Sequence, residues 1–270
     1  MIQYFSPAII TYTLFLTALL GASSGSFAAC MAARIVSGED FLRGRSHCDR
    51  CGHVLTGRDL IPIVSWFLLK GKCRWCGERV SVRCPITEIL CAAAFAGLVL
   101  RYDISLQTLQ YLILTVLLLT AALVDYDSGV IPNGLLLAMI VDWLAFTPFL
   151  NGGGFVQNLA YGLAGGLIAS VPLLLLSLLM DLVLKKESMG GGDIKLFFAA
   201  GLFFSWRGVL FLIILSCILG IVFALATRKT TGNEENPKAF PFGPAIAAGV
   251  YVSLLAAEPL MDMYFNLFQA

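Results

Sequence analysis

Two aspartates stand at the edges of apolar segments, in surroundings that suit acid–base chemistry. Asp125 ends one such segment, and Asp193 follows three glycines directly before another. An acidic side chain at the centre of a membrane helix costs about 2.5–3.5 kcal/mol on insertion scales, so its presence calls for a reason. Two carboxylates that share a site tend to hold one proton between them. The ionised member can accept a proton from water while the protonated member donates to a peptide carbonyl, so the pair predicts peptide hydrolysis.

The residues beside these aspartates fit a site where chains meet closely. Gly190 and Gly192 belong to the glycine triplet before Asp193. Glycine lets another backbone, such as that of a substrate strand, approach closely. Pro132 follows Asp125 by seven residues. Because proline begins a helix well but cannot continue one, Pro132 predicts the start of the next helix.

Each aspartate also has a simpler interpretation. An aspartate at the edge of a membrane segment can cap a helix, or it can pair with a neighbouring cation such as Lys195. Asp127 lies two residues after Asp125, and physical reasoning from the residues alone does not separate the two. Both alternatives stay open at this level.

Other ionisable residues leave little room for a different hydrolytic apparatus. Glu88, Asp142 and Asp181 lie in or beside apolar segments, where we expect them to make polar contacts between elements. The two histidines, His47 and His53, both lie in a polar segment near the N-terminus. The membrane part therefore lacks a Ser-His or HExxH arrangement, and carboxylates must carry its acid–base chemistry.

Four cysteines in that polar segment have the spacing of a zinc site. Cys48 with Cys51, and Cys73 with Cys76, form two Cys-x-x-Cys pairs separated by 21 residues. Four thiolates in two such pairs can surround one zinc ion tetrahedrally. Because four sulfurs leave no position for a catalytic water, we predict a structural zinc. Thiols without metal, or a redox pair, are the alternative.

The composition is that of an integral membrane protein. Of the 270 residues, 59% are hydrophobic and only 13% are charged, and the mean hydropathy is +0.86. A soluble domain carries roughly a quarter charged residues, so this chain has too little charge to cover a water-exposed surface. The net charge of +1 gives no indication of nucleic-acid binding.

The apolar residues fall in blocks, many of them near the roughly 20 residues that a membrane-crossing helix needs. We predict an all-α polytopic membrane protein with about eight transmembrane helices and a small cytoplasmic zinc-binding insert. The predicted domains are a first helix at 1–33, the insert at 34–85 and a helical peptidase domain at 86–270. The predicted segments are approximately 8–33, 86–100, 106–124, 131–149, 156–184, 194–206, 209–227 and 242–257.

Basic residues fix the expected orientation. Ten of the 18 lysines and arginines lie between Arg34 and Arg83, and none precedes the first apolar block. Six more lie in or beside two later loops: Lys185, Lys186, Lys195, Arg228, Lys229 and Lys238. Loops rich in lysine and arginine stay in the cytoplasm. We therefore expect the N-terminus outside and both aspartates at the cytoplasmic face.

In this order, the motifs resemble those of the type IV prepilin peptidases, which are leader peptidases and N-methyltransferases. The resemblance runs through the two Cys-x-x-Cys pairs and Arg83-Cys-Pro85-Ile-Thr-Glu88. It continues through Asp125 with Ile131-Pro132, Gly190-Gly-Gly-Asp193-Ile-Lys195 and Pro241-Phe-Gly-Pro244. It covers most of the chain, and the ordered set is far more specific than Gly-x-Gly-Asp alone.

The resemblance implies a function and a set of roles. Asp125 and Asp193 map to the two catalytic aspartates, which favours Asp125 over Asp127 by resemblance only. Type IV prepilins and pilin-like pseudopilins are the implied substrates, cut after a glycine to remove a short basic leader. Methylation of the new N-terminus with S-adenosylmethionine is the implied second activity. The implied location is the bacterial inner membrane, in contact with lipid; the sequence does not indicate the oligomeric state.

Two rival functions use the same residues differently. An ion- or proton-coupled transporter would use the acids as a relay, but it needs acids spaced across the bilayer, and only Asp142 lies mid-segment. A non-catalytic zinc-anchored subunit of a secretion system would not need either aspartate. The archaeal preflagellin peptidases share the aspartates, but they generally lack the cysteine insert.

Overall fold

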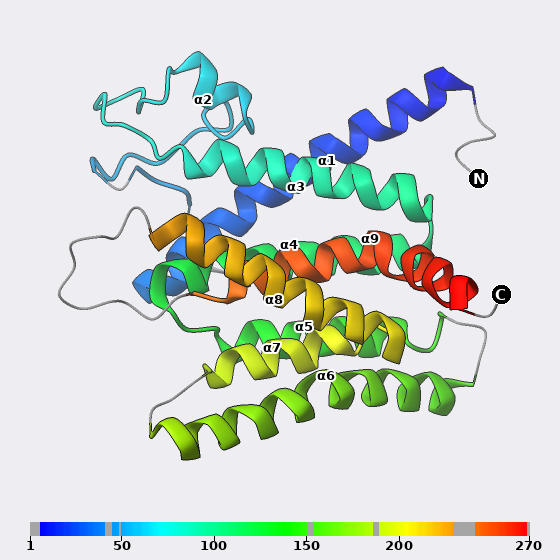
Figure 1. The fold of residues 1–270 in the computed structure, drawn as a ribbon. Helices are drawn as coiled ribbons and strands as arrows, with labels where there is room; N and C mark the ends of the chain where they lie inside the picture. The colour runs from blue at the N-terminus through cyan, green and yellow to red at the C-terminus, as the bar shows by residue number, and fades with distance from the viewer. Residues whose placement is uncertain are drawn as a thin grey trace. The chain divides into compact units, whose positions relative to one another are not determined.

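The computed structural model describes residues 6–40, 45–48, 50–150, 154–185, 189–228 and 241–268, with the backbone alone for 227–228 and 265–268 (Figure 1). The basic residues Lys186, Lys229 and Lys238 of the predicted cytoplasmic loops lie outside the described residues.

The described part of the chain is all-helical, as predicted. It contains two isolated β-bridges, in the cysteine insert, and no strand. Its nine helices are α1 (Pro7–Ser37), α2 (Val64–Leu68), α3 (Arg83–Tyr102), α4 (Leu106–Ser128), α5 (Asn133–Phe146), α6 (Phe155–Leu184), α7 (Gly191–Gly201), α8 (Trp206–Arg228) and α9 (Gly243–Phe268). All eight predicted membrane segments coincide with a helix, and α2 belongs to the insert.

Six of the described helices are long and apolar enough to cross a membrane: α1, α3, α4, α6, α8 and α9. α3 has 20 residues, more than the short segment predicted there. α5 has only 14 and α7 only 11. At 1.5 Å per residue, α5 spans about 21 Å, less than the roughly 30 Å hydrocarbon core. The count of eight crossings therefore stays a prediction.

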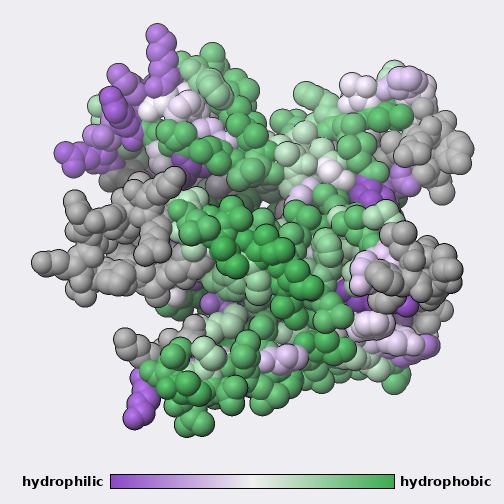
Figure 2. All heavy atoms as spheres, viewed as in Figure 1, coloured by the Kyte–Doolittle hydropathy of each residue, from purple (hydrophilic) through white to green (hydrophobic). Residues whose placement is uncertain are grey.

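The helical surfaces are apolar, as a lipid environment requires. On α6, the exposed side chains include Leu175, Leu179 and Leu182. Figure 2 shows hydrophobic residues over most of the visible helical surface, with hydrophilic residues gathered toward its edges. Such a surface would be unfavourable in water.

The chain divides into two compact units, Met1–Thr120 and Ala121–Ala270, and α4 contributes to both. In the first unit, α1 packs along α3 through small residues. A Cβ on Gly21 would lie 2.7 Å from the carbonyl oxygen of Cys91, and one on Gly25 would lie 2.7 Å from that of Thr87. Glycine at both positions lets the two helix backbones approach closely.

In the second unit, α7 is the central element. It packs against α5, α6 and α9, and its residues Leu196, Phe197, Ala199 and Ala200 are fully buried. A Cβ on Gly165 of α6 would lie 2.5 Å from the carbonyl oxygen of Gly201, so glycine at this position lets α6 and α7 pack closely. α7 is thus a short helix enclosed by longer ones, and Asp193 stands at its beginning.

Candidate active site and metal site

Asp125 lies in the last turn of α4 and is buried, with 4% of its surface exposed. α4 ends three residues later, at Ser128, because Gly129 adopts a positive φ of 69° and donates its N–H to the Asp125 carbonyl at 2.7 Å. Pro132 is the N-cap residue of α5, as predicted. Asp127, the rival candidate, is exposed. Burial therefore separates the two aspartates where sequence reasoning did not.

Asp193 lies in the first turn of α7 and is partly buried. Gly190 is the N-cap residue, and its carbonyl accepts the N–H of Asp193 at 3.1 Å. A Cβ on Gly192 would lie 3.4 Å from the Cβ of Ile131. Gly192 therefore brings the start of α7 against the turn that separates Asp125 from α5.

The structure brings the two aspartates close enough to interact electrostatically. Burial raises the pKa of Asp193 to about 7, and the negative charge of Asp125 contributes to that rise. A carboxyl with this pKa retains a proton in a substantial fraction of molecules near neutral pH. The pair can therefore present one proton donor and one proton acceptor.

A third segment, which belongs to the motif Pro241-Phe-Gly-Pro244 but to which sequence reasoning assigned no role, contacts Asp125. The N–H of Gly243, the first residue of α9, donates to Oδ2 of Asp125 at 2.7 Å. A Cβ on Gly243 would lie 2.7 Å from the same oxygen and 2.9 Å from the Asp125 Cβ, so any larger residue would displace the carboxylate. The positive end of the α9 dipole also favours negative charge there. The signal in the sequence was a glycine set between Phe242 and Pro244.

Phe242 fixes the position of Gly243. Its ring packs where a Cβ on Gly220 of α8 would stand, and it lies 6.2 Å from the ring of Phe197 on α7. Phe197 follows Asp193 by four residues and so lies on the same face of α7. The beginning of α9 therefore contacts both the Asp125 carboxylate and the helix that carries Asp193.

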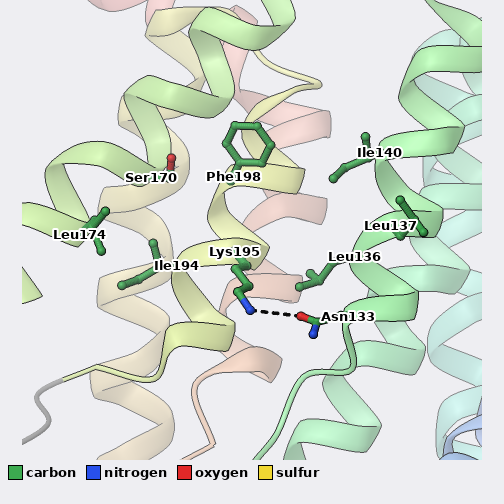
Figure 3. A pocket seen from close by; sticks show the side chains of 9 residues that line it. All are labelled: Asn133, Leu136, Leu137, Ile140, Ser170, Leu174, Ile194, Lys195 and Phe198. Atoms are coloured by element: carbon green, nitrogen blue, oxygen red, sulfur yellow. Dashed lines mark hydrogen bonds between the residues drawn. The ribbon is translucent and has the colours of Figure 1, made fainter.

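Lys195 does not neutralise the pair. Its Nζ donates to Oδ1 of Asn133 at 3.2 Å, and among the described residues it forms no ion pair with Asp125 or Asp193 (Figure 3). This hydrogen bond lies at one end of an apolar groove of about 520 Å³. The groove is lined by Asn133, Leu136, Leu137, Ile140, Ser170, Leu174, Ile194, Lys195 and Phe198.

Glu88 and Asp142, the other two buried acids in the described part of the chain, differ in their hydrogen bonding. Glu88 makes the expected polar contact with the insert, since its carboxylate accepts the N–H of Ile63 at 2.6 Å. Asp142 is buried in α5, but neither of its carboxylate oxygens has a hydrogen-bond partner among the described residues. The polar contact expected of Asp142 is therefore absent from the structure.

The first cysteine pair forms a tight turn at the start of the insert. The N–H of Cys48 donates to the carbonyl of His53 at 3.0 Å, and the N–H of Gly52 donates back to Cys48 at 2.8 Å. Gly52 has a φ of 68°, which favours glycine.

The second pair repeats this turn. The N–H of Cys73 donates to the carbonyl of Glu78 at 2.7 Å, and the N–H of Gly77 donates to the carbonyl of Cys73 at 3.0 Å. Gly77 has a φ of 71°. The backbone N–H groups of Cys76 and Trp75 point at the Cys73 sulfur and lower the pKa of its thiol to about 7. A glycine after each Cys-x-x-Cys pair was the sequence signal for this repeated geometry.

The four thiols converge as a metal site requires. All four Sγ atoms lie within 4.8 Å of one another, and those of Cys48 and Cys76 are 3.8 Å apart. Zn–S bonds of about 2.3 Å in a tetrahedron separate the sulfurs by about 3.8 Å. The N–H of Glu78 favours the Cys76 thiolate, but loss of solvent and the neighbouring thiols outweigh it and raise the pKa of Cys76 to about 12. Four thiolates therefore need a cation, and the cluster fits one.

Two side-chain contacts join the turns. The rings of His53 and Trp75 lie 4.0 Å apart, and Nε of Arg74 lies 2.7 Å from Oδ1 of Asp59. Hydrogen bonds from the Thr56 side chain and from Arg74 lower the pKa of Asp59 to about 2, so this ion pair persists at neutral pH. His53 is thus a packing residue of the insert.

Comparison with known proteins agrees with this geometry. Residues 19–102 match the bacterial peptidase A24 N-terminal domain, and residues 112–225, which include both aspartates, match the type IV leader peptidase family. No solved structure matches the chain significantly.

Three curated relatives carry the name prepilin leader peptidase/N-methyltransferase. The protein from Bacillus subtilis (strain 168) is 31% identical over 92% of this chain and 96% of its own length. The protein from Aeromonas salmonicida (strain A449) is 31% identical over 82% of this chain and 75% of its own length. The protein from Myxococcus xanthus (strain DK1622) is 30% identical over 90% of this chain and 71% of its own length. The resemblance that the motifs indicated is confirmed, and the chain belongs to the type IV leader peptidase family.

Proposed function

We propose that this chain is a membrane aspartyl endopeptidase that removes the short basic leader from type IV prepilins and pseudopilins, cutting after a glycine. The observation that carries the proposal is the electrostatic interaction of Asp125, which is buried, with Asp193, which is partly buried and comes from a separate helix of the second unit. Membership of the leader peptidase family and the names of the relatives support the substrate class.

In the proposed mechanism, the two aspartates have opposite protonation states. Asp125 is the base, because the Gly243 N–H and the beginning of α9 stabilise its charge. Asp193, with its raised pKa, holds the proton. Asp125 takes a proton from water as the water oxygen attacks the peptide carbonyl carbon, and Asp193 donates to the carbonyl oxygen. Collapse of the tetrahedral intermediate breaks the C–N bond. The proton on Asp125 passes to the leaving amine, and one hydroxyl of the intermediate returns a proton to Asp193 as the carboxyl product forms.

The surrounding residues would hold the substrate. Gly190 and Gly192 keep side chains away from the start of α7, so an extended substrate backbone can reach the aspartates there. Lys195 and Asn133 would keep their hydrogen bond at the end of the groove, and Pro132 would keep the start of α5 in place.

We further propose that Cys48, Cys51, Cys73 and Cys76 hold a structural zinc ion. Four sulfur ligands suit zinc, and the convergence of the thiols supports a single ion. The metal would join the two turns of an insert that has little hydrophobic core. Methylation of the new N-terminus with S-adenosylmethionine is the second proposed activity; it rests on the relatives' names, and no residue is assigned to it.

The proposed setting is the bacterial inner membrane, with the N-terminus outside, and the aspartates and insert at the cytoplasmic face. The clustering of basic residues supports this orientation. The proposed division is a first helix (1–33), the insert (34–85) and the peptidase domain (86–270).

The aspartates are tested by single substitutions in the purified full-length protein. We expect Asp125→Asn and Asp193→Asn each to lower the rate of leader removal by at least about 10²–10⁴-fold, because each removes one partner of the proton transfer. Mass spectrometry of a prepilin incubated with enzyme and S-adenosylmethionine reports cleavage and methylation separately.

Asp127→Asn is the matched control, since Asp127 lies on the same turn as Asp125 but is exposed. This variant should remove the leader at the wild-type rate. Thermal unfolding of all three variants near the wild-type temperature would show that folding is intact. Full processing by both Asp125→Asn and Asp193→Asn would refute the mechanism.

The contact from α9 is tested by Gly243→Ala. The added Cβ must push the Asp125 carboxylate from its place, so we expect kcat to fall about 10²-fold with little change in KM. Gly134→Ala is the control, because a Cβ there meets nothing within 4 Å. Equal kcat values for the two variants would show that Gly243 does not position Asp125.

The pKa of Asp193 predicts an alkaline limit to activity. Asp193 donates a proton only while protonated, and its pKa lies at about 7, above the usual 3.8. The rate should therefore fall as pH rises through 7, by about tenfold for each further pH unit. A pH–rate profile measured with a saturating prepilin checks this. A rate that stays constant between about pH 6 and 9 would contradict the assignment of Asp193 as the acid.

The zinc proposal is tested by metal analysis of cysteine variants. We expect one zinc per chain in the wild type, and loss of that metal with earlier thermal unfolding in Cys51→Ser, because three sulfurs no longer complete the shell. Cys217→Ser, an exposed cysteine outside the cluster, should keep the metal. A wild-type protein purified without chelators but free of zinc would remove the proposed role.

A further inference from the structure

The short helix α2 exposes an apolar face on the insert. Val64, Phe67 and Leu68 are 49%, 61% and 76% exposed. Their spacing of three and four residues places them on one side of α2. Leu60 and Ile61, in the turn before α2, are also exposed and apolar. An apolar patch of this kind on a polar insert marks an interaction surface.

The opposite side of this segment is held by the insert itself. The ring of Trp66 packs where a Cβ on Gly71 would stand, and its Nε1–H donates to the carbonyl of Val80 at 3.3 Å. Trp66 therefore holds one side of α2 against the insert. The apolar face of α2, formed by Val64, Phe67 and Leu68, points away from the insert.

A hydrogen bond fixes the level of α2 along α3. The N–H of Ile63, the N-cap residue of α2, donates to Glu88. Glu88 lies five residues into α3, which at 1.5 Å per residue is about 7–8 Å from its first residue. The headgroup layer on each side of the hydrocarbon core is about 5–8 Å thick. Since α3 is long and apolar enough to cross a membrane, this hydrogen bond holds the start of α2 beside the first turns of a candidate membrane-spanning helix.

The charges around α2 are suited to anionic headgroups. Arg58, Lys70 and Lys72 flank it in sequence and are exposed. Two described acids near α2 have basic partners within the insert: Asp59 pairs with Arg74, and Glu78 lies 3.9 Å from Arg50. In Figure 2, hydrophobic residues lie over the region of α2 beside hydrophilic residues of the insert.

We propose that α2 is an interfacial membrane anchor. Val64, Phe67 and Leu68 enter the boundary between the headgroups and acyl chains of the leaflet at which α3 begins, and the flanking lysines contact the phosphates of anionic phospholipids. Amphipathic segments with an apolar face and basic flanks bind bilayers in this way. The anchor holds the cysteine insert against the bilayer, and the inference does not rest on the peptidase function.

Photocrosslinking of the full-length protein in lipid nanodiscs tests the proposal. Leu68→p-benzoylphenylalanine places a photoreactive ketone at the most exposed position of the face. Arg50→p-benzoylphenylalanine is the control, because the Arg50 side chain is similarly exposed at 77% but lies in the first cysteine turn. Mass spectrometry identifies the adducts, and an unchanged metal content shows that the insert is folded in both variants.

We expect a phospholipid adduct at position 68 in at least severalfold higher yield than at position 50. The yield at 68 should fall when Phe67→Asp is added, since the charge opposes insertion of the face. It should rise when phosphatidylglycerol replaces part of the phosphatidylcholine. Equal lipid adducts at both positions, or a crosslink from position 68 to protein instead of lipid, would overturn the anchor. Equal yields in the two bilayers would overturn the role of anionic lipid.

Discussion

The second unit depends on keeping two carboxylates close together where water is scarce. A charged carboxylate removed from water is unfavourable unless hydrogen-bond donors replace the solvent. Asp125 obtains such a donor from Gly243, at the first turn of a 26-residue helix. The carboxylate of Asp193, in the first turn of α7, shows no such hydrogen bond among the described residues, and burial and the negative charge of Asp125 raise its pKa to about 7. The asymmetry between the two surroundings is what divides the proposed roles of base and acid.

Close backbone approach makes this arrangement possible. Gly243 lets α9 begin beside Asp125, where a Cβ would lie 2.7 Å from the carboxylate oxygen, and α7 begins in contact with Ile131. The free N–H groups at the beginning of a helix point along its axis, so a helix that starts at a carboxylate supplies donors without a side chain.

The sequence predicted what local residues determine. Apolar blocks predicted a helix at each of eight positions, and the Cys-x-x-Cys spacing predicted four convergent thiols. It did not predict that Gly243 contacts Asp125, because that contact joins residues 118 positions apart and leaves no periodic signal. Nor did it separate Asp125 from Asp127 on physical grounds, since burial depends on the packing of other helices. The expected contact of Asp142 failed for the same reason: a mid-helix acid predicts a polar partner, but tertiary packing decides whether one is present.

The ligand chemistry of the cysteine cluster bears on how the proposed hydrolysis must proceed. A metal ion activates water only when a coordination position is open, and four sulfurs close a tetrahedral shell. The cluster is therefore suited to holding two backbone turns together and not to binding the attacking water. Both histidines belong to the same insert, and one packs on Trp75. In the proposed mechanism, activation of water within the second unit falls to carboxylates. Among its described acids, Asp125 and Asp193 interact electrostatically, and Asp125 has a supporting hydrogen-bond donor.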